Sequence, residues 1–115
     1  VGLMGYIATQ AAYRDGKAWH SALLDYLRAN RDLVERSVGA MPGVRIWHAQ
    51  ATYLSWMDAR ALDVDDPVKL FTDAGVGLYD GASFGAPGFL RLNFACPRSL
   101  LSQALERISR ALASV

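Results

Sequence analysis

Residues 89–95, FLRLNFA, place one charge inside an apolar run. In a β-strand, successive side chains point to opposite faces of the sheet. Leu90, Leu92 and Phe94 therefore share one face, and Arg91 lies on the other. A strand with one apolar face needs a layer of apolar side chains packed against it. The sequence thus predicts a sheet that is covered on one face, with Arg91 on the opposite face.

Helical patterns at both ends of the chain can supply that apolar layer. Apolar residues recur at helical spacing from Trp19 to Val38, and residues 101–112 form one apolar stripe opposed by polar residues. Residues 3–12 show a further helical pattern that contains no charge and ends before the turn signal Asp-Gly at 15–16. We therefore expect two helices at the start of the chain and one at its end.

The middle of the chain contains short segments typical of strands and one short helix. Residues 44–48 and 52–58 are rich in β-branched and aromatic residues, which predicts two adjacent strands joined by the small turn at 49–51. Residues 65–75 predict a short helix with an aspartate as N-cap, and residues 76–81 a brief strand. Together these elements predict an α+β two-layer sandwich: a mostly antiparallel sheet of three to four strands with helices mainly on one face, formed by residues 1–115 as a single domain.

Composition excludes several classes of partner. The chain has twelve Lys and Arg and eleven Asp and Glu, a net charge of +1. The basic residues are scattered along the sequence, so a nucleic-acid interface is not expected. The uncharged first segment is too short to span a bilayer and lacks the basic start of a signal peptide. The single Cys96 excludes an intramolecular disulfide and favours a reducing cytoplasm. Neither His20 nor His48 has a second ligand at metal-binding spacing, so no metal site is expected.

Several conspicuous side chains have plain structural interpretations. Trp19, Trp47 and Trp56 are interpreted as core and packing residues, because no basic residues alternate with them as in a base-stacking surface. Arg98 is interpreted as a solvated surface charge, and Cys96 as a small space-filling residue.

Arg91 requires a partner for its charge, since removing a guanidinium from water without one costs several kcal/mol. Two hypotheses meet this requirement. One is an internal salt bridge with a carboxylate of the chain, for which Asp58 at the end of the neighbouring strand is the obvious candidate. The other is an anionic ligand. Spacing alone favours the salt bridge.

Five blocks of the sequence keep the order and spacing of a known family. They are AAYRDGKAW, YLRANRDLVE, ATYLSWMDARAL, GASFGAPGFLRLNFACPRSLL and ALERI. The sequence from residue 1 to about 108 resembles the C-terminal region of fold-type I, pyridoxal-phosphate (PLP) dependent aminotransferases of class I/II, most closely the branch of cystathionine β-lyase-like carbon-sulfur lyases. The resemblance implies that Arg91 binds the substrate's α-carboxylate, that Phe84 and Gly85 help shape the cleft, and that Tyr53 lies near the site. A planar guanidinium suits this role because it grips a carboxylate at two points.

The same resemblance implies that the chain is the C-terminal small domain of a longer enzyme whose large domain is absent. The chain begins at Val1 with a helical pattern already running, which agrees with a fragment. Neither Lys17 nor Lys69 has the context of the family's cofactor-binding lysine. The chain alone is therefore expected to contain no catalytic or cofactor-binding residue, to bind no PLP and to be inactive. Its implied partners are its own large domain, an amino-acid substrate and a second subunit in a homodimer.

For the parent enzyme, the resemblance implies β-elimination at a carbon-sulfur bond, giving a keto acid, ammonia and a thiol. Transamination within the same family is the alternative, because the groups that choose between the two reactions are outside this sequence. A third hypothesis, of another class, is a free-standing non-catalytic module that binds a small acid or a protein. The uncharged first helix is also expected to expose apolar surface once it is separated from the large domain.

Overall fold

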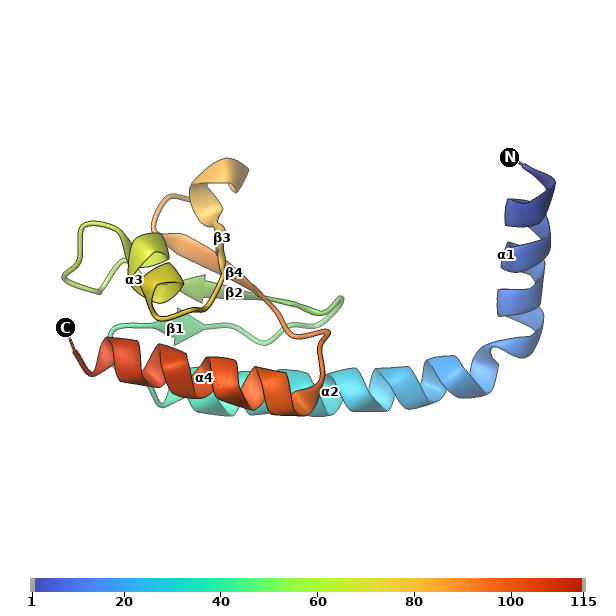
Figure 1. Ribbon diagram of the computed structural model, residues 1–115, viewed down its shortest axis with the longest axis horizontal. Helices are drawn as coiled ribbons and strands as arrows, with labels where there is room; N and C mark the ends of the chain where they lie inside the picture. The colour runs from blue at the N-terminus through green and yellow to red at the C-terminus, as the bar shows by residue number, and fades with distance from the viewer. Residues whose placement is uncertain (1, 115) are drawn as a thin grey trace.

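A four-stranded antiparallel sheet lies at the centre of the fold in the computed structural model, which describes residues 2–114 (Figure 1). Its strands are β1 (Arg45–Ile46), β2 (Leu54–Asp58), β3 (Tyr79–Asp80) and β4 (Phe89–Asn93), in the spatial order β1-β2-β4-β3. The two long strands, β2 and β4, pair at the centre of the sheet, so β4 has a neighbour on each side. The predicted α+β class and antiparallel sheet are confirmed.

Helices cover one face of this sheet. They are α2 (Lys17–Gly39), α3 (Pro67–Asp73) and α4 (Arg98–Leu112), and α2 and α4 run side by side beneath the sheet in Figure 1. Leu90 and Leu92 of β4 point into this layer and are buried, as their alternation predicts. The core is completed from all three helices and the central strands; its most buried members are Val34, Val38, Met57, Phe71, Leu90, Phe94, Leu101 and Ile108.

The short helix α3 begins as its sequence predicts. The carboxylate of Asp66 accepts a hydrogen bond from the backbone N–H of Lys69 at 2.9 Å, and Pro67 occupies the first turn. After the helix, Gly75 adopts a φ of +77°, which a glycine tolerates without strain, and the chain turns toward β3. The cap and the turn therefore fix where β3 begins beside β4.

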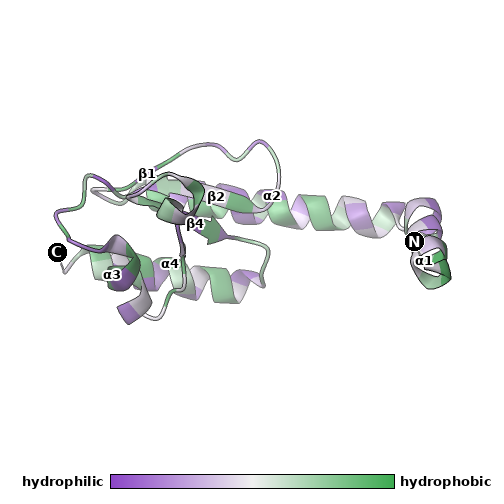
Figure 2. Cartoon of the chain, turned by 90° about the horizontal axis from the view of Figure 1, so that it is seen from above, coloured by the Kyte–Doolittle hydropathy of each residue, from purple (hydrophilic) through white to green (hydrophobic). Residues whose placement is uncertain are grey.

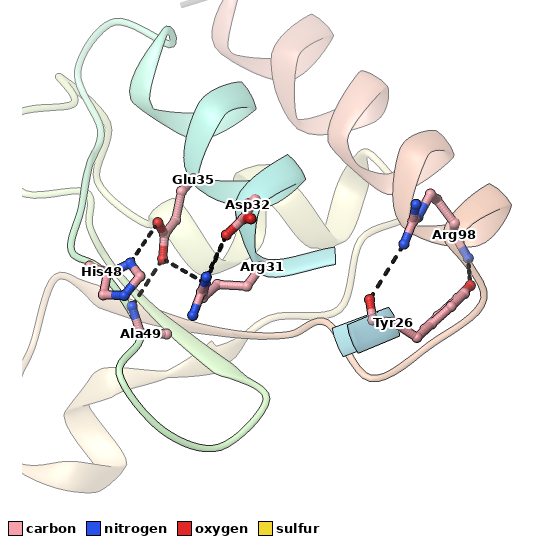
Figure 3. A network of polar contacts seen from close by, with 7 residues as sticks. All are labelled: Tyr26, Arg31, Asp32, Glu35, His48, Ala49 and Arg98. Atoms are coloured by element: carbon pink, nitrogen blue, oxygen red, sulfur yellow. Dashed lines mark hydrogen bonds and ion pairs between the residues drawn. The ribbon is translucent and has the colours of Figure 1, made fainter. Parts of the chain in front are cut away.

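The start of α4 is held against α2 by Asn30 and Arg98. The buried amide of Asn30 donates hydrogen bonds to the backbone oxygens of Phe94 at 2.9 Å and Cys96 at 3.0 Å, and its oxygen accepts one from Nε of Arg98 at 3.0 Å. The backbone N–H of Arg98 also donates to the hydroxyl of Tyr26 at 2.7 Å (Figure 3). The interpretation of Arg98 as a merely solvated charge was therefore wrong, because its guanidinium joins two helices.

The connection from β1 to β2 is longer than the predicted three-residue turn, because β1 ends at Ile46 and β2 begins at Leu54. It is tied to α2 by Glu35, whose carboxylate accepts from the backbone N–H of Ala49 at 3.0 Å and lies 3.0 Å from Nδ1 of His48 (Figure 3). These two contacts with Glu35 fix the path of the loop between β1 and β2.

Helix α1 (Leu3–Asp15) and the first turns of α2 extend away from the sheet (Figures 1 and 2). No residue of α1 is buried, and the buried residues of α2 all lie in its second half. Trp19 is 70% exposed, so its interpretation as a core residue was wrong for this chain. The expected exposure of apolar surface on the first helix is confirmed: Leu3, Met4 and Tyr6 are each more than 60% exposed. Among residues 2–114, no helix is long and apolar enough to cross a membrane.

Candidate functional site

Arg91 occupies the centre of the face of the sheet that the helices leave uncovered. Its partner across β2 is Trp56 and its partner across β3 is Tyr79, so these three side chains emerge on the same face. The uncovered face of β4 also includes Phe89, which stacks on the ring of Trp56 with centroids 5.7 Å apart. The placement of Arg91 opposite the helices, which strand alternation predicts, is confirmed.

The guanidinium of Arg91 lies against aromatic rings. Its Cζ atom is 4.6 Å from the ring centroid of Tyr79 and 4.6 Å from that of Phe84. Phe84 belongs to the short 3-10 helix η1 (Gly81–Phe84), which lies between β3 and β4 in the chain. Ring faces attract the positive charge but accept no ordinary hydrogen bond. These contacts therefore leave the N–H groups of Arg91 without a hydrogen-bond acceptor among the described residues.

No carboxylate pairs with Arg91 within the described part of the chain, and its Nε is buried without a hydrogen-bond partner there. Asp58, the expected partner, lies across from Phe89 rather than Arg91 and is occupied by Arg60, whose Nη2 is 2.8 Å from Oδ2 of Asp58. The internal salt bridge that spacing alone favours is therefore wrong. A buried donor without a partner costs about 1 to 3 kcal/mol, and an anionic ligand is one kind of group that could accept from it.

An open depression of about 370 Å³ reaches Arg91 from the edge of the sheet. Its polar lining includes Arg91, Tyr79, Asn93 and Cys96. Burial raises the pKa of the Cys96 thiol, so this side chain stays protonated at neutral pH and is a poor nucleophile. Arg91 is then the charged group that this depression offers to a ligand.

Tyr53 lies immediately before β2, three residues ahead of Trp56. Its side chain is 46% exposed, and its backbone oxygen accepts a hydrogen bond from the N–H of Phe94 at 3.0 Å. The rings that contact the Arg91 guanidinium come from Tyr79 and Phe84, so a role for Tyr53 at the site stays a prediction. Sequence reasoning missed Tyr79, whose only signal is its aromatic character in the short strand that precedes the glycine-rich loop.

The two lysines of the chain do not fit a PLP site. Lys69 is exposed on α3, with its Nζ 2.6 Å from Oδ2 of Asp73, and Lys17 is exposed at the start of α2. The ion pair raises the pKa of the Lys69 ammonium, which opposes the neutral amine that attack on an aldehyde requires. Within residues 2–114, no group of three His, Cys, Asp or Glu side chains could hold a metal ion.

Comparison with known proteins gives a consistent result. Residues 3–108 match the family described as "Aminotransferase class I and II". A cystathionine beta-lyase of Corynebacterium glutamicum is 35% identical over 117 residues, which cover 97% of this chain and 31% of that protein. The crystal structure of OvoB superposes with a TM-score of 0.95 at 45% identity, covering 100% of this chain and 30% of the other. The PLP-bound C-S lyase from Staphylococcus hominis gives a TM-score of 0.82 at 33% identity, covering 93% and 30%. This chain thus spans just under a third of the length of these relatives.

Proposed function

The chain belongs to the class I and II aminotransferase family, and we propose that it is the C-terminal small domain of a longer PLP-dependent enzyme in which Arg91 binds the α-carboxylate of an amino-acid substrate. The fraction of the relatives that it covers and the PLP named for the Staphylococcus hominis structure support the proposal. The cofactor supplies an electron sink for bond breaking at the substrate's α-carbon. Its binding groups belong to the large domain, since the lysines of this chain do not fit the role.

The observation that carries the proposal is the unpaired guanidinium of Arg91. Its charge has no carboxylate partner among the described residues, and its buried Nε–H has no acceptor there. A substrate carboxylate would supply both, through two parallel hydrogen bonds that fix its orientation as well as its position. Fixing the carboxylate limits rotation about the bond to the α-carbon, and a positioned substrate reacts faster because less entropy is lost at the reacting step.

The reaction that we propose for the parent enzyme is β-elimination from a sulfur-containing amino acid. The bond between the β-carbon and sulfur breaks, a thiol leaves, and addition of water then gives a keto acid and ammonia. The names of the Corynebacterium and Staphylococcus proteins favour this reaction. Transamination is the second candidate, favoured by the description of the family itself. The same carboxylate contact serves both reactions.

We assign the exposed apolar residues of α1 to contact with the large domain, and the parent to the cytoplasm as a homodimer. Leu3, Met4 and Tyr6 would otherwise expose their apolar side chains to water. The single Cys96 is free and half-buried, in keeping with a reducing compartment. By itself the chain is expected to be inactive, and PLP added to it should give no saturable yellow complex.

The proposal is tested by replacing Arg91 in the longer protein. Arg91→Ala should raise KM for amino-acid substrates at least about 30-fold, because a charged pair is lost, while the absorbance of the bound cofactor stays unchanged. Arg91→Lys should recover only part of the loss, because an ammonium cannot bind a carboxylate at two points. Arg110→Ala, which removes an exposed arginine of α4, is the matched control. An unchanged KM, or loss of cofactor in Arg91→Ala, would contradict the assignment.

The third hypothesis, a free-standing binding module, is tested by the same protein. A large domain that carries a cofactor-binding lysine upstream of residue 1 would eliminate it. A start codon directly before Val1, together with saturable binding of a small acid by this chain alone, would establish it instead.

A further inference from the structure

We propose that Tyr79 and Phe84 are positioning residues that hold the guanidinium of Arg91 in its carboxylate-binding orientation. This inference rests on the function proposed for Arg91. Neither ring needs to touch the substrate, since each acts through the arginine.

Tyr79 reaches Arg91 through strand pairing. Cα register places the two residues directly across from each other on β3 and β4, where side chains on the same face lie close together. The ring centroid of Tyr79 is 4.6 Å from the guanidinium carbon, within the range of a cation–π contact. Tyr79 is 63% exposed, so its ring is not part of the core. Its one described side-chain contact of this kind is with Arg91.

Phe84 reaches Arg91 from η1, and this turn is fixed at both ends. The carboxylate of Asp80 accepts from the backbone N–H of Ala82 at 2.9 Å, and Gly85 adopts a φ of +77°. The Phe84 ring then meets Trp56 edge to face with centroids 6.0 Å apart. Because Trp56 is itself the β2 partner of Arg91, Phe84 is held between two neighbours of the same side chain.

Aromatic contacts suit this role better than a carboxylate would. An ion pair would also order the guanidinium, but it would occupy the donors that the substrate needs. A ring attracts the charge through its face and leaves those donors free. Arginine otherwise loses much rotational freedom when it binds, so ordering it beforehand lowers the entropic cost of binding the substrate.

The geometry is tested first in the 115-residue chain by NMR of the Arg91 Nε–H, assigned by its disappearance in Arg91→Lys. Ring currents from Tyr79 and Phe84 should shift this signal. Tyr79→Leu and Phe84→Leu should each move it toward the position of a free arginine, whereas Tyr79→Phe should leave it in place. Tyr13→Leu, which removes an 88% exposed ring from α1, is the matched control. A signal that none of the substitutions moves would overturn the proposal.

The function is tested in the longer protein by steady-state kinetics. Tyr79→Leu and Phe84→Leu should each raise KM about two- to fivefold with a smaller effect on kcat, and Tyr79→Phe should restore KM. In an Arg91→Ala background the same Leu substitutions should have no further effect, since the group that they position is gone. Both rings are more than half exposed, so their loss should leave the fold intact, which thermal melting checks.

The possible failures are distinguishable. If Arg91→Ala leaves KM unchanged, the proposed function of Arg91 fails. If Arg91→Ala raises KM but neither Leu substitution does, only the positioning role fails. If the Leu substitutions raise KM equally with and without Arg91, the rings contact the substrate directly, and the positioning role is again wrong.

Discussion

Asp58 binds Arg60 through both of its carboxylate oxygens: Oδ1 accepts from Nε at 2.9 Å and Oδ2 accepts from Nη2 at 2.8 Å. Oδ1 also accepts from the backbone N–H of Arg60 at 3.0 Å. This local pair satisfies the acid at the end of β2 and removes it as a partner for Arg91. Arg91 therefore lacks this carboxylate partner because an arginine two residues from the aspartate binds it instead.

The pair predicts a pH dependence of stability. Hydrogen bonding to Arg60 lowers the pKa of Asp58 from 3.8 to about 2. A depressed pKa contributes stability that is present above the ordinary value and is lost as the pH falls through the folded value. The difference in free energy of unfolding between the natural chain and Asp58→Asn should therefore shrink as the pH falls from about 4 toward 2.

Chemical denaturation at several pH values measures this difference. Asp25→Asn is the control, because the ion pair of Asp25 with Arg28 is exposed and should contribute little at any pH. A difference for Asp58→Asn that stays constant down to pH 2 would contradict the assignment of the low pKa.

Asn30 should be among the most sensitive polar positions of the chain. Asn30→Ala leaves the backbone oxygens of Phe94 and Cys96 without their donor and Nε of Arg98 without its acceptor. We expect a loss of about 2 to 3 kcal/mol in the free energy of unfolding, measured by urea denaturation. Arg28→Ala, two residues earlier on the exposed side of α2, should change it by less than about 0.5 kcal/mol. Equal effects of the two substitutions would show that the buried amide is not important.

Gly81 should not tolerate a side chain. A Cβ there would meet the backbone oxygen of Ala86 and lie 2.6 Å from that of Phe89, so η1 would have to move away from β4. Gly81→Ala should cost about 1 to 3 kcal/mol of stability. In Gly77→Ala the new Cβ has nothing within 4 Å, and this variant should be as stable as the natural chain or slightly more so.

Thermal melting compares the two glycine variants, and the Arg91 Nε–H signal reports the position of η1. Gly81→Ala should shift this signal because Phe84 moves with the turn. Melting temperatures that fall by the same amount in both variants would contradict the packing argument.

The apolar surface of α1 should make the isolated chain associate with itself. Leu3 and Ile7 are 73% and 48% exposed, and each can bury its side chain against a second copy. The sedimentation coefficient should therefore rise with concentration, and the double substitution Leu3→Glu and Ile7→Glu should suppress the rise. Glutamates at Thr9 and Gln10, which add the same charge to exposed polar positions of α1, serve as the control. A monomer at all concentrations would count against this prediction.

Strand alternation in residues 89–93 predicted the face of Arg91, because a period of two leaves a residue only one alternative face. The N-cap of α3 could also be predicted from the sequence, since an aspartate before a proline is a local signal. The contact of Arg98 with α2 could not be predicted from the sequence, because its acceptor Asn30 is 68 residues away. The exposure of Trp19 was missed for another reason: helical periodicity shows that a face is apolar, but not whether this chain or another body covers it.

On the uncovered face of the sheet, the sequence indicated Arg91 but not the aromatic rings that contact it. The contact between Tyr79 and Arg91 depends on the register of β3 with β4, and β3 has only two residues. So short a strand has no periodicity from which a register could be inferred.

Because α2 extends beyond the sheet, the thermal stability of the chain and its tendency to associate should depend on different residues. Cooperative melting should depend on the second half of this helix and on the elements that follow it, since α1 contributes no buried residue. Self-association should depend on the exposed apolar residues of α1. Substitutions in roughly the first twenty residues can therefore alter aggregation while leaving the melting temperature untouched, so a thermal screen alone would overlook them.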